Sequence, residues 1–231
     1  MMAVMSALGW GAVAASSVVL GALLALWRHW PERWVGAVLA FGAGALISAV
    51  SFELVQDGVQ KARGLPVAVG LGVGALTYFV AAGKVAAMGG GGALALGAFL
   101  DGIPEQMVLG IGLASGEPVS AGLLTAIFVS NLPEAIGGAT DMKREMHSNR
   151  RVMLNWLWIA CFCAAATVVG YAIADVVSNE LQAGINGFAA GALLVMLVDS
   201  MIPEATEQAG RTTGLVTTLG FAVAAGLSFT T

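Results

Sequence analysis

Two apolar segments of the sequence carry side chains that are costly to place in a membrane. FLDGIPEQMVLGIGL (99–113) and VSNLPEA (129–135) each contain a Pro-Glu pair. The candidate metal-binding side chains in them are those of Asp101, Glu105, Ser130, Asn131 and Glu134. An ionised carboxylate at the centre of a bilayer costs about 2.5–3.5 kcal/mol on insertion scales, so such groups usually face a bundle interior and mark an ion path. We therefore expect these side chains to converge inside a bundle.

The spacing of these residues puts them on one face of each helix. Asp101 and Glu105 are four residues apart, so they share a helix face. The same spacing joins Ser130 to Glu134. Each segment therefore presents one polar stripe.

A proline inside each segment should expose backbone oxygen as well. Pro104 and Pro133 each remove one helical hydrogen bond, which frees a carbonyl that needs a cation or water at membrane depth. Carboxylate, hydroxyl, amide and carbonyl oxygens together suit a divalent cation. The alternative is a pair of kinked helices whose acids stay protonated and bond to each other.

The composition identifies the elements that must position this site. Of 231 residues, 58% are hydrophobic and only 10% are charged, which indicates an all-α polytopic membrane protein with one transmembrane domain over 1–231. Apolar runs of about 20 residues predict eight spans. They cover 4–27, 34–56, 65–83, 91–115, 119–140, 152–174, 182–203 and 212–229.

The basic residues predict the orientation of these spans. Eight of the ten lie in loops on one side, and Lys61 and Arg63 lie on the other. The positive-inside rule then places the loop 142–151 in the cytoplasm and both termini outside. We interpret this basic loop as a topology anchor and expect no nucleic-acid partner.

The sequence also contains internal repeats. Residues 41–58 align without gaps onto 188–205, and 100–106 align onto 129–135. The first pair of segments crosses in opposite directions in the predicted topology, which is the layout of many secondary transporters. We therefore expect a 3+2+3 arrangement, with inverted repeats in spans 1–3 and 6–8 around a central two-helix core.

These motifs resemble the core of the ZIP (Zrt/Irt-like) divalent-metal transporters. The resemblance rests on DGIPE (101–105), SNLPE (130–134) and DSMIPE (199–204). It implies that Glu105 and Glu134 are bridging carboxylates of the metal site and that Asp101 takes the place of a histidine. It also implies ligand roles for Ser130 and Asn131.

The resemblance carries further expectations about location and partners. It implies a multi-pass protein of a prokaryotic plasma membrane that moves zinc, manganese, iron or cadmium as cargo, with no prosthetic group. The partners are divalent metal ions, the lipid bilayer and, by resemblance alone, a second copy in a homodimer. Carboxylate in place of imidazole hardens the site and shifts its relative preference toward manganese or ferrous iron.

A second tier of residues could line the path or hold another metal. It consists of Glu53, Asp199, Glu204 and Cys163. Glu53 and Asp199 could line an entrance or exit, or each could bond a neighbouring helix. Glu204 and its repeat partner Asp57 are expected at solvated span ends.

Three other classes of function remain open. The same acids could serve a proton or monovalent-cation pathway, or the chain could be a non-transporting ZIP-like receptor. An intramembrane hydrolase is disfavoured, because the sequence has no HExxH motif and no Ser/His pair at membrane depth. We therefore expect no enzyme activity.

Overall fold

Helices account for every element of the described chain. The computed structural model describes residues 2–88, 90–114, 119–145, 148–174 and 176–229, without the side chains of 2–3, 88 and 90–101. The longer elements are α1 Met2–Trp27, α2 Glu32–Ala49, α4 Gly64–Met88, α5 Gly90–Ala114, α6 Ala121–Arg144, α7 Asn149–Ala174, α8 Asn179–Met196 and α10 Thr213–Ser228. The shorter ones are η1 Val50–Gln56, α3 Asp57–Ala62, η2 Leu197–Met201, α9 Ile202–Ala209 and η3 Gly210–Thr212. The expectation of an all-helical protein is confirmed for these residues.

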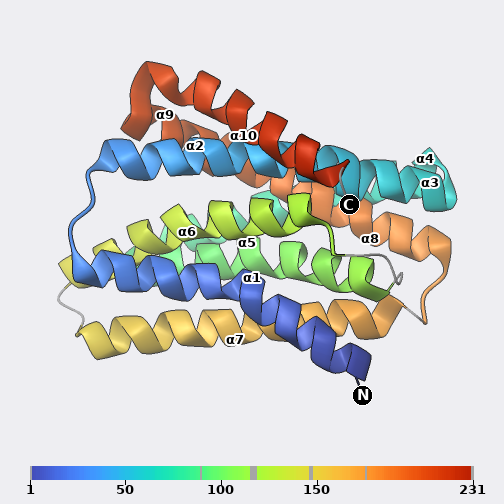
Figure 1. The fold of residues 1–231 in the computed structure, drawn as a ribbon, viewed down its shortest axis with the longest axis horizontal. Helices are drawn as coiled ribbons and strands as arrows, with labels where there is room; N and C mark the ends of the chain where they lie inside the picture. The colour runs from blue at the N-terminus through green and yellow to red at the C-terminus, as the bar shows by residue number, and fades with distance from the viewer. Residues whose placement is uncertain (1, 89, 115–118, 146–147, 175, 230–231) are drawn as a thin grey trace.

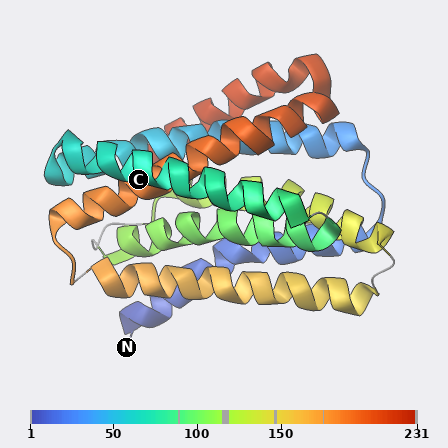
Figure 2. The same ribbon diagram turned by 180° about the vertical axis from the view of Figure 1, so that it is seen from behind.

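The long helices lie side by side and run in alternating directions along the chain (Figure 1). The view from behind shows α4 crossing the back of the bundle (Figure 2). In both views α5 and α6 lie inside the bundle, with α1 and α7 on one side and α2, α8 and α10 on the other. The bundle thus surrounds the two helices that carry the Pro-Glu pairs.

Five helical stretches in the described residues are long and apolar enough to cross a membrane. They are Val4–Trp27, Glu32–Ala62, Gly64–Ala87, Asn149–Ala174 and Asn179–Ser228. By length and composition the chain is therefore a multi-pass membrane protein. The last stretch has 50 residues and folds back on itself at Gly210, whose φ of 64° suits glycine. The division into eight spans stays a prediction.

Two π-helices follow α2 and α8 at equivalent positions along these helices. Helix α2 continues into η1, and α8 continues into η2. The bounds of α8 are those of α2 shifted by 147 residues, and η2 starts 147 residues after η1. A π-helix widens the turn by one residue and often marks a functional position. Here the two π-helices carry Glu53 and Asp199.

Glycines let these helices approach each other closely. A β-carbon at Gly44 would overlap the carbonyl of Thr217 in α10, and one at Gly191 would overlap the carbonyl of Leu71 in α4. Helix α2 therefore packs on α10, and α8 packs on α4, through backbone contact. Small residues of this kind promote helix association in membranes.

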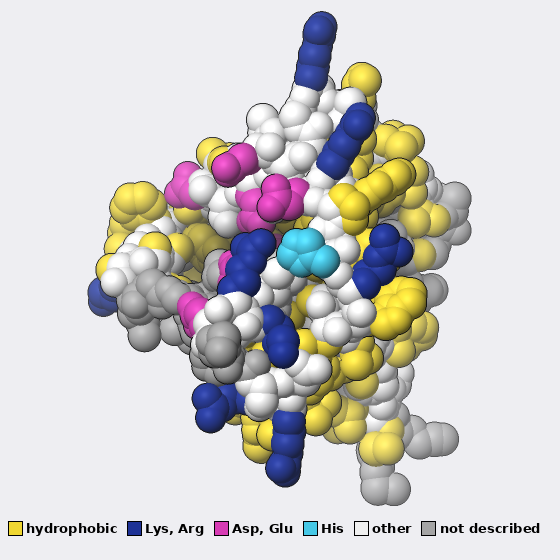
Figure 3. All heavy atoms as spheres, turned by 90° about the vertical axis from the view of Figure 1, so that its left-hand side faces the viewer, with side chains coloured by type: hydrophobic (Ala, Val, Ile, Leu, Met, Phe, Trp, Pro, Cys, Tyr) yellow, Lys and Arg dark blue, Asp and Glu magenta, His cyan; other side chains and the backbone are white. Residues whose placement is uncertain are grey.

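The two ends of the bundle differ in charge. The end of α1 and the starts of α2 and α10 lie at one end, where Lys and Arg side chains gather together with several Asp and Glu side chains (Figure 1 and Figure 3). That end includes Arg28, Arg33, Lys143, Arg144 and Arg211. Lys61 and Arg63 lie at the end of α3, at the opposite end of the bundle.

Candidate metal site

Helices α5 and α6 bring the two Pro-Glu motifs together. Pro104 lies inside α5 and Pro133 inside α6, and both helices continue past the proline. Helix α5 packs on α6 and α7, while α6 also packs on α1 and α2. The motifs are therefore surrounded by protein on several sides.

A buried hydrogen bond joins the two motifs. Nδ2 of Asn131 donates to Oε2 of Glu105 at 3.0 Å and to the carbonyl of Ile127 at 2.8 Å. Glu105 is only 2% exposed and Asn131 only 4%. A buried carboxylate without a hydrogen-bond donor costs more free energy than an ordinary hydrogen bond contributes, so Glu105 needs a donor such as Asn131. The pair therefore fixes the two helices at a polar point of contact.

The residue after Glu105 makes a second polar link. The hydroxyl of Thr167 in α7 donates to Oε1 of Gln106 at 2.5 Å, and both side chains are buried. One turn before Glu105, the thiol of Cys163 packs on the backbone of Gly102, where an added β-carbon would lie 2.7 Å from Sγ. Cys163 is 2% exposed, and Glu105 lies near enough to act on it electrostatically. Helix α7 therefore supports α5 on both sides of Glu105.

The other predicted ligands lie on the same two helices. Ser130 is buried, and its hydroxyl donates to the carbonyl of Ile127 at 3.1 Å. Glu134 lies one turn after Ser130 in α6. Its side chain is half-buried and interacts with a neighbouring group. Asp101 belongs to α5, but its side chain lies outside the described residues. Among the side chains that are described, no group of three His, Cys, Asp or Glu residues is close enough to hold a metal ion. The ligand set therefore stays a prediction.

The second-tier acids belong to elements other than the two Pro-Glu helices. Glu53 in η1 accepts a hydrogen bond from the hydroxyl of Ser120 at 2.6 Å. Asp199 in η2 is exposed. Glu204 in α9 is also exposed and accepts from Nε2 of Gln208 at 2.9 Å. Glu53 is thus hydrogen-bonded to the residue that starts α6, while Oε1 of Glu204 lies 4.0 Å from where a β-carbon of Gly137 in α6 would be.

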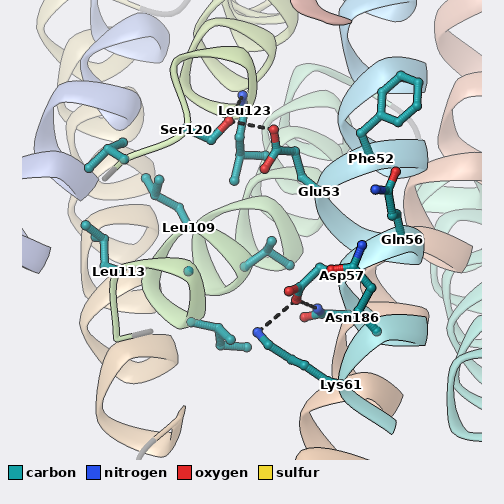
Figure 4. Close-up of a pocket in the computed structure, with 15 residues that line it drawn as sticks. Phe52, Glu53, Gln56, Asp57, Lys61, Leu109, Leu113, Ser120, Leu123 and Asn186 are labelled. Atoms are coloured by element: carbon teal, nitrogen blue, oxygen red, sulfur yellow. Dashed lines mark hydrogen bonds and ion pairs between the residues drawn. The ribbon is translucent and has the colours of Figure 1, made fainter. Parts of the chain in front are cut away.

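A cavity opens beside Glu53 (Figure 4). It is lined in part by α3, which lies at the end of the bundle opposite the start of α2 (Figure 1). Its volume is about 220 Å³, and it lies between η1, α3, the second half of α5 and the start of α6. Its polar lining comes from Glu53, Gln56, Asp57, Gln60, Lys61, Ser120 and Asn186. Asp57 bonds Lys61 and Asn186 there, each at 2.8 Å. The expected solvated Asp57 is thus a half-buried member of a polar cluster.

Sequence reasoning missed the cavity and the Gln106–Thr167 link. The four-residue spacing of Asp57 and Lys61 is an ordinary signal for an ion pair on one helix. Asn186 is 129 residues away from Asp57 along the chain. No local pattern relates these two residues.

Comparison with known proteins gives a distant similarity to a transporter-named protein. No family model matches the chain. An Arabidopsis thaliana protein named "Putative zinc transporter" is 27% identical to it over 210 residues. The aligned part covers 84% of this chain, and the chain spans about a third of the length of that relative.

Proposed function

We propose that this chain transports divalent metal ions across a membrane by alternating access. The transport site consists of Asp101, Glu105, Ser130, Asn131 and Glu134. The observation that carries the proposal is the buried hydrogen bond between Asn131 and Glu105, which joins the two Pro-Glu helices. A metal entering between these helices would take over the carboxylate that Asn131 now satisfies. The distant similarity to a protein named for zinc transport supports metal transport as the general class.

The proposed architecture is eight spans in a 3+2+3 arrangement with inverted repeats. Three observations support it. The bounds of α2 and η1 recur in α8 and η2, and these two stretches run in opposite directions (Figure 1). The packing of α2 on α10 corresponds to that of α8 on α4, and the packing of α1 on α6 to that of α7 on α5. Such pseudo-symmetry allows two bundles to rock around a central site.

The proposed orientation places the basic end of the bundle in the cytoplasm and both termini outside. The gathering of Lys and Arg at one end supports it (Figure 3). The proposed location is the plasma membrane of a prokaryote. The cavity beside Glu53 then opens toward the outside.

The proposed cargo is zinc, manganese or ferrous iron. The name of the distant relative favours zinc. The oxygen donors favour harder ions in relative terms, because carboxylate and amide oxygens bind manganese well, whereas the Irving–Williams order still favours zinc over manganese in absolute affinity. Competition between zinc and manganese during uptake decides between these two tendencies.

Uptake into proteoliposomes tests the proposal. The parent chain should take up zinc, manganese, ferrous iron or cadmium, and the double variant Glu105→Gln/Glu134→Gln should reduce uptake to the level of protein-free liposomes. The matched control is Glu32→Gln/Glu207→Gln, which changes two exposed carboxylates and should leave uptake near the parent rate.

Two results would overturn the proposal. If Glu105→Gln/Glu134→Gln left metal uptake intact, these two residues would not form the transport site. Proton flux without any metal dependence would favour a proton or monovalent-cation pathway through the same acids.

A further inference from the structure

The cavity beside Glu53 contains a polar atom that lacks a partner. Asn186 is 2% exposed, and in the part of the chain that the structure describes its Oδ1 has no hydrogen-bond partner. Its Nδ2 faces Oδ2 of Asp57, so the opposite orientation of the amide would set two acceptors against each other. The unpartnered atom is therefore the carbonyl oxygen of a residue that lines the cavity. A buried oxygen without a donor calls for a cation or a donor molecule.

Two carboxylates point into the same cavity (Figure 4). Glu53 and Asp57 are four residues apart at the junction of η1 and α3, so they share a helix face. The proton of Ser120 goes to Glu53, while its oxygen accepts from the backbone N–H of Leu123 as the N-cap of α6. The N-cap residue of α6 therefore lies directly against the carboxylate of Glu53.

Lys61 offsets the charge of one of these two carboxylates, that of Asp57. Its Nζ lies 2.8 Å from Oδ2 of Asp57, the same oxygen that Asn186 contacts. Among the described residues, the charged side chains that line the cavity are those of Glu53, Asp57 and Lys61, with a formal charge of −1 in total. The lysine side chain is 23% exposed and flexible, so it can move out toward solvent at little cost.

We propose that this cavity is a second divalent-cation site, bound by Glu53, Asp57 and Oδ1 of Asn186, in which the ammonium of Lys61 is a built-in competitor. When a cation enters, Lys61 leaves Asp57, and the two carboxylates are neutralised by the divalent charge. The donors are all hard oxygens, which suits manganese or magnesium. This inference deepens the proposed function and rests on it in one respect, namely that the cavity is the loading side of the transport path.

Binding of Mn²⁺ to the purified full chain tests the site without any need for transport. The chain carries Glu105→Gln/Glu134→Gln, so that the proposed transport site does not contribute, and free Mn²⁺ is followed by its electron paramagnetic resonance signal. Asp57→Asn should abolish the remaining binding. Lys61→Met should tighten binding by about tenfold or more, because it removes a positive charge next to the site. Misfolding cannot produce such a gain.

The matched control is Arg63→Gln, which removes a positive charge two residues away from Lys61. Arg63 does not line the cavity, so this variant should change Mn²⁺ affinity by less than about twofold, as expected for a screened surface charge. Equal effects of Lys61→Met and Arg63→Gln would overturn the site, as would Mn²⁺ binding that survives Asp57→Asn or the absence of any binding.

The two proposals fail separately. Uptake that depends on Glu105 and Glu134, combined with no Mn²⁺ binding in the cavity, would leave the transport proposal in place and remove this one. Mn²⁺ binding in the cavity of a chain that transports no metal would leave the cavity site in place and overturn the transport proposal.

Discussion

The α5–α6 contact and the cavity beside α3 both hold carboxylates next to amides, but they stabilise them differently. At the contact, Glu105 is almost fully buried and Asn131 donates to it directly. In the cavity, Asp57 is half-exposed and Lys61 neutralises it. An ion pair at a half-exposed position gives way easily, because its net contribution is about 1 kcal/mol or less. The buried hydrogen bond between Asn131 and Glu105 is harder to break. We therefore expect a cation to replace Lys61 in the cavity more readily than it replaces Asn131 at the contact, so the contact should be the more selective of the two sites.

The largest effect should come from removing the amide at the contact. Asn131→Leu takes away the donor to Glu105 and one oxygen of the proposed site. We expect a loss of about 2–3 kcal/mol in stability, since a hydrogen bond to a charged group is lost in a buried position, together with a loss of uptake. Thermal unfolding in detergent and proteoliposome uptake measure the two quantities. A variant with the stability and uptake of the parent would remove Asn131 from the site.

A smaller effect should come from the packing that supports the contact. A β-carbon at Gly110 would overlap the carbonyl of Thr167, so Gly110→Ala should push α5 away from α7 at a cost of about 1–3 kcal/mol. Gly112 lies on the same helix with no atom within 4 Å of an added β-carbon, so Gly112→Ala should be neutral or stabilise the fold by about 0.5–1 kcal/mol. Thermal unfolding of the two variants side by side makes the comparison. Equal unfolding temperatures would mean that α5 and α7 are not in close backbone contact.

The smallest effect should come from the cavity. Ser120→Ala removes the N-cap of α6 and the bond to Glu53, both of them half-buried, and should cost about 1–2 kcal/mol. Ser178 caps α8 in the same way at an exposed end, so Ser178→Ala should cost about 0.5–1 kcal/mol. Unfolding of both variants in detergent measures the difference. A larger cost for Ser178 than for Ser120 would indicate that the Glu53 bond adds no stability.

The sequence predicted the helical class and the position of the two Pro-Glu pairs inside helices, because both depend on local signals. Apolar runs and Pro-Glu pairs can be recognised within about 20 residues. The contact between Asn131 and Glu105 was within reach too, because both residues belong to the two Pro-Glu motifs that were expected to converge inside the bundle.

The rest of the polar structure depends on contacts that no local pattern contains. A π-helix has about one residue more per turn than an α-helix, and no pattern in the sequence predicted the two π-helices here. One of them, η1, carries Glu53. Asn186 meets Asp57 only because α8 packs along η1 and α3. The link from Gln106 to Thr167 likewise joins two helices that are separated by α6 along the chain.

The most direct test of the central proposal is the position of the metal itself. Crystals of the full chain soaked with zinc should show an anomalous scattering peak between Glu105 in α5 and Glu134 in α6, and the peak should disappear in Glu105→Gln/Glu134→Gln. A zinc peak that persists between positions 105 and 134 in that variant, or a parent chain with no peak between these two residues, would contradict the assignment of these helices as the transport site.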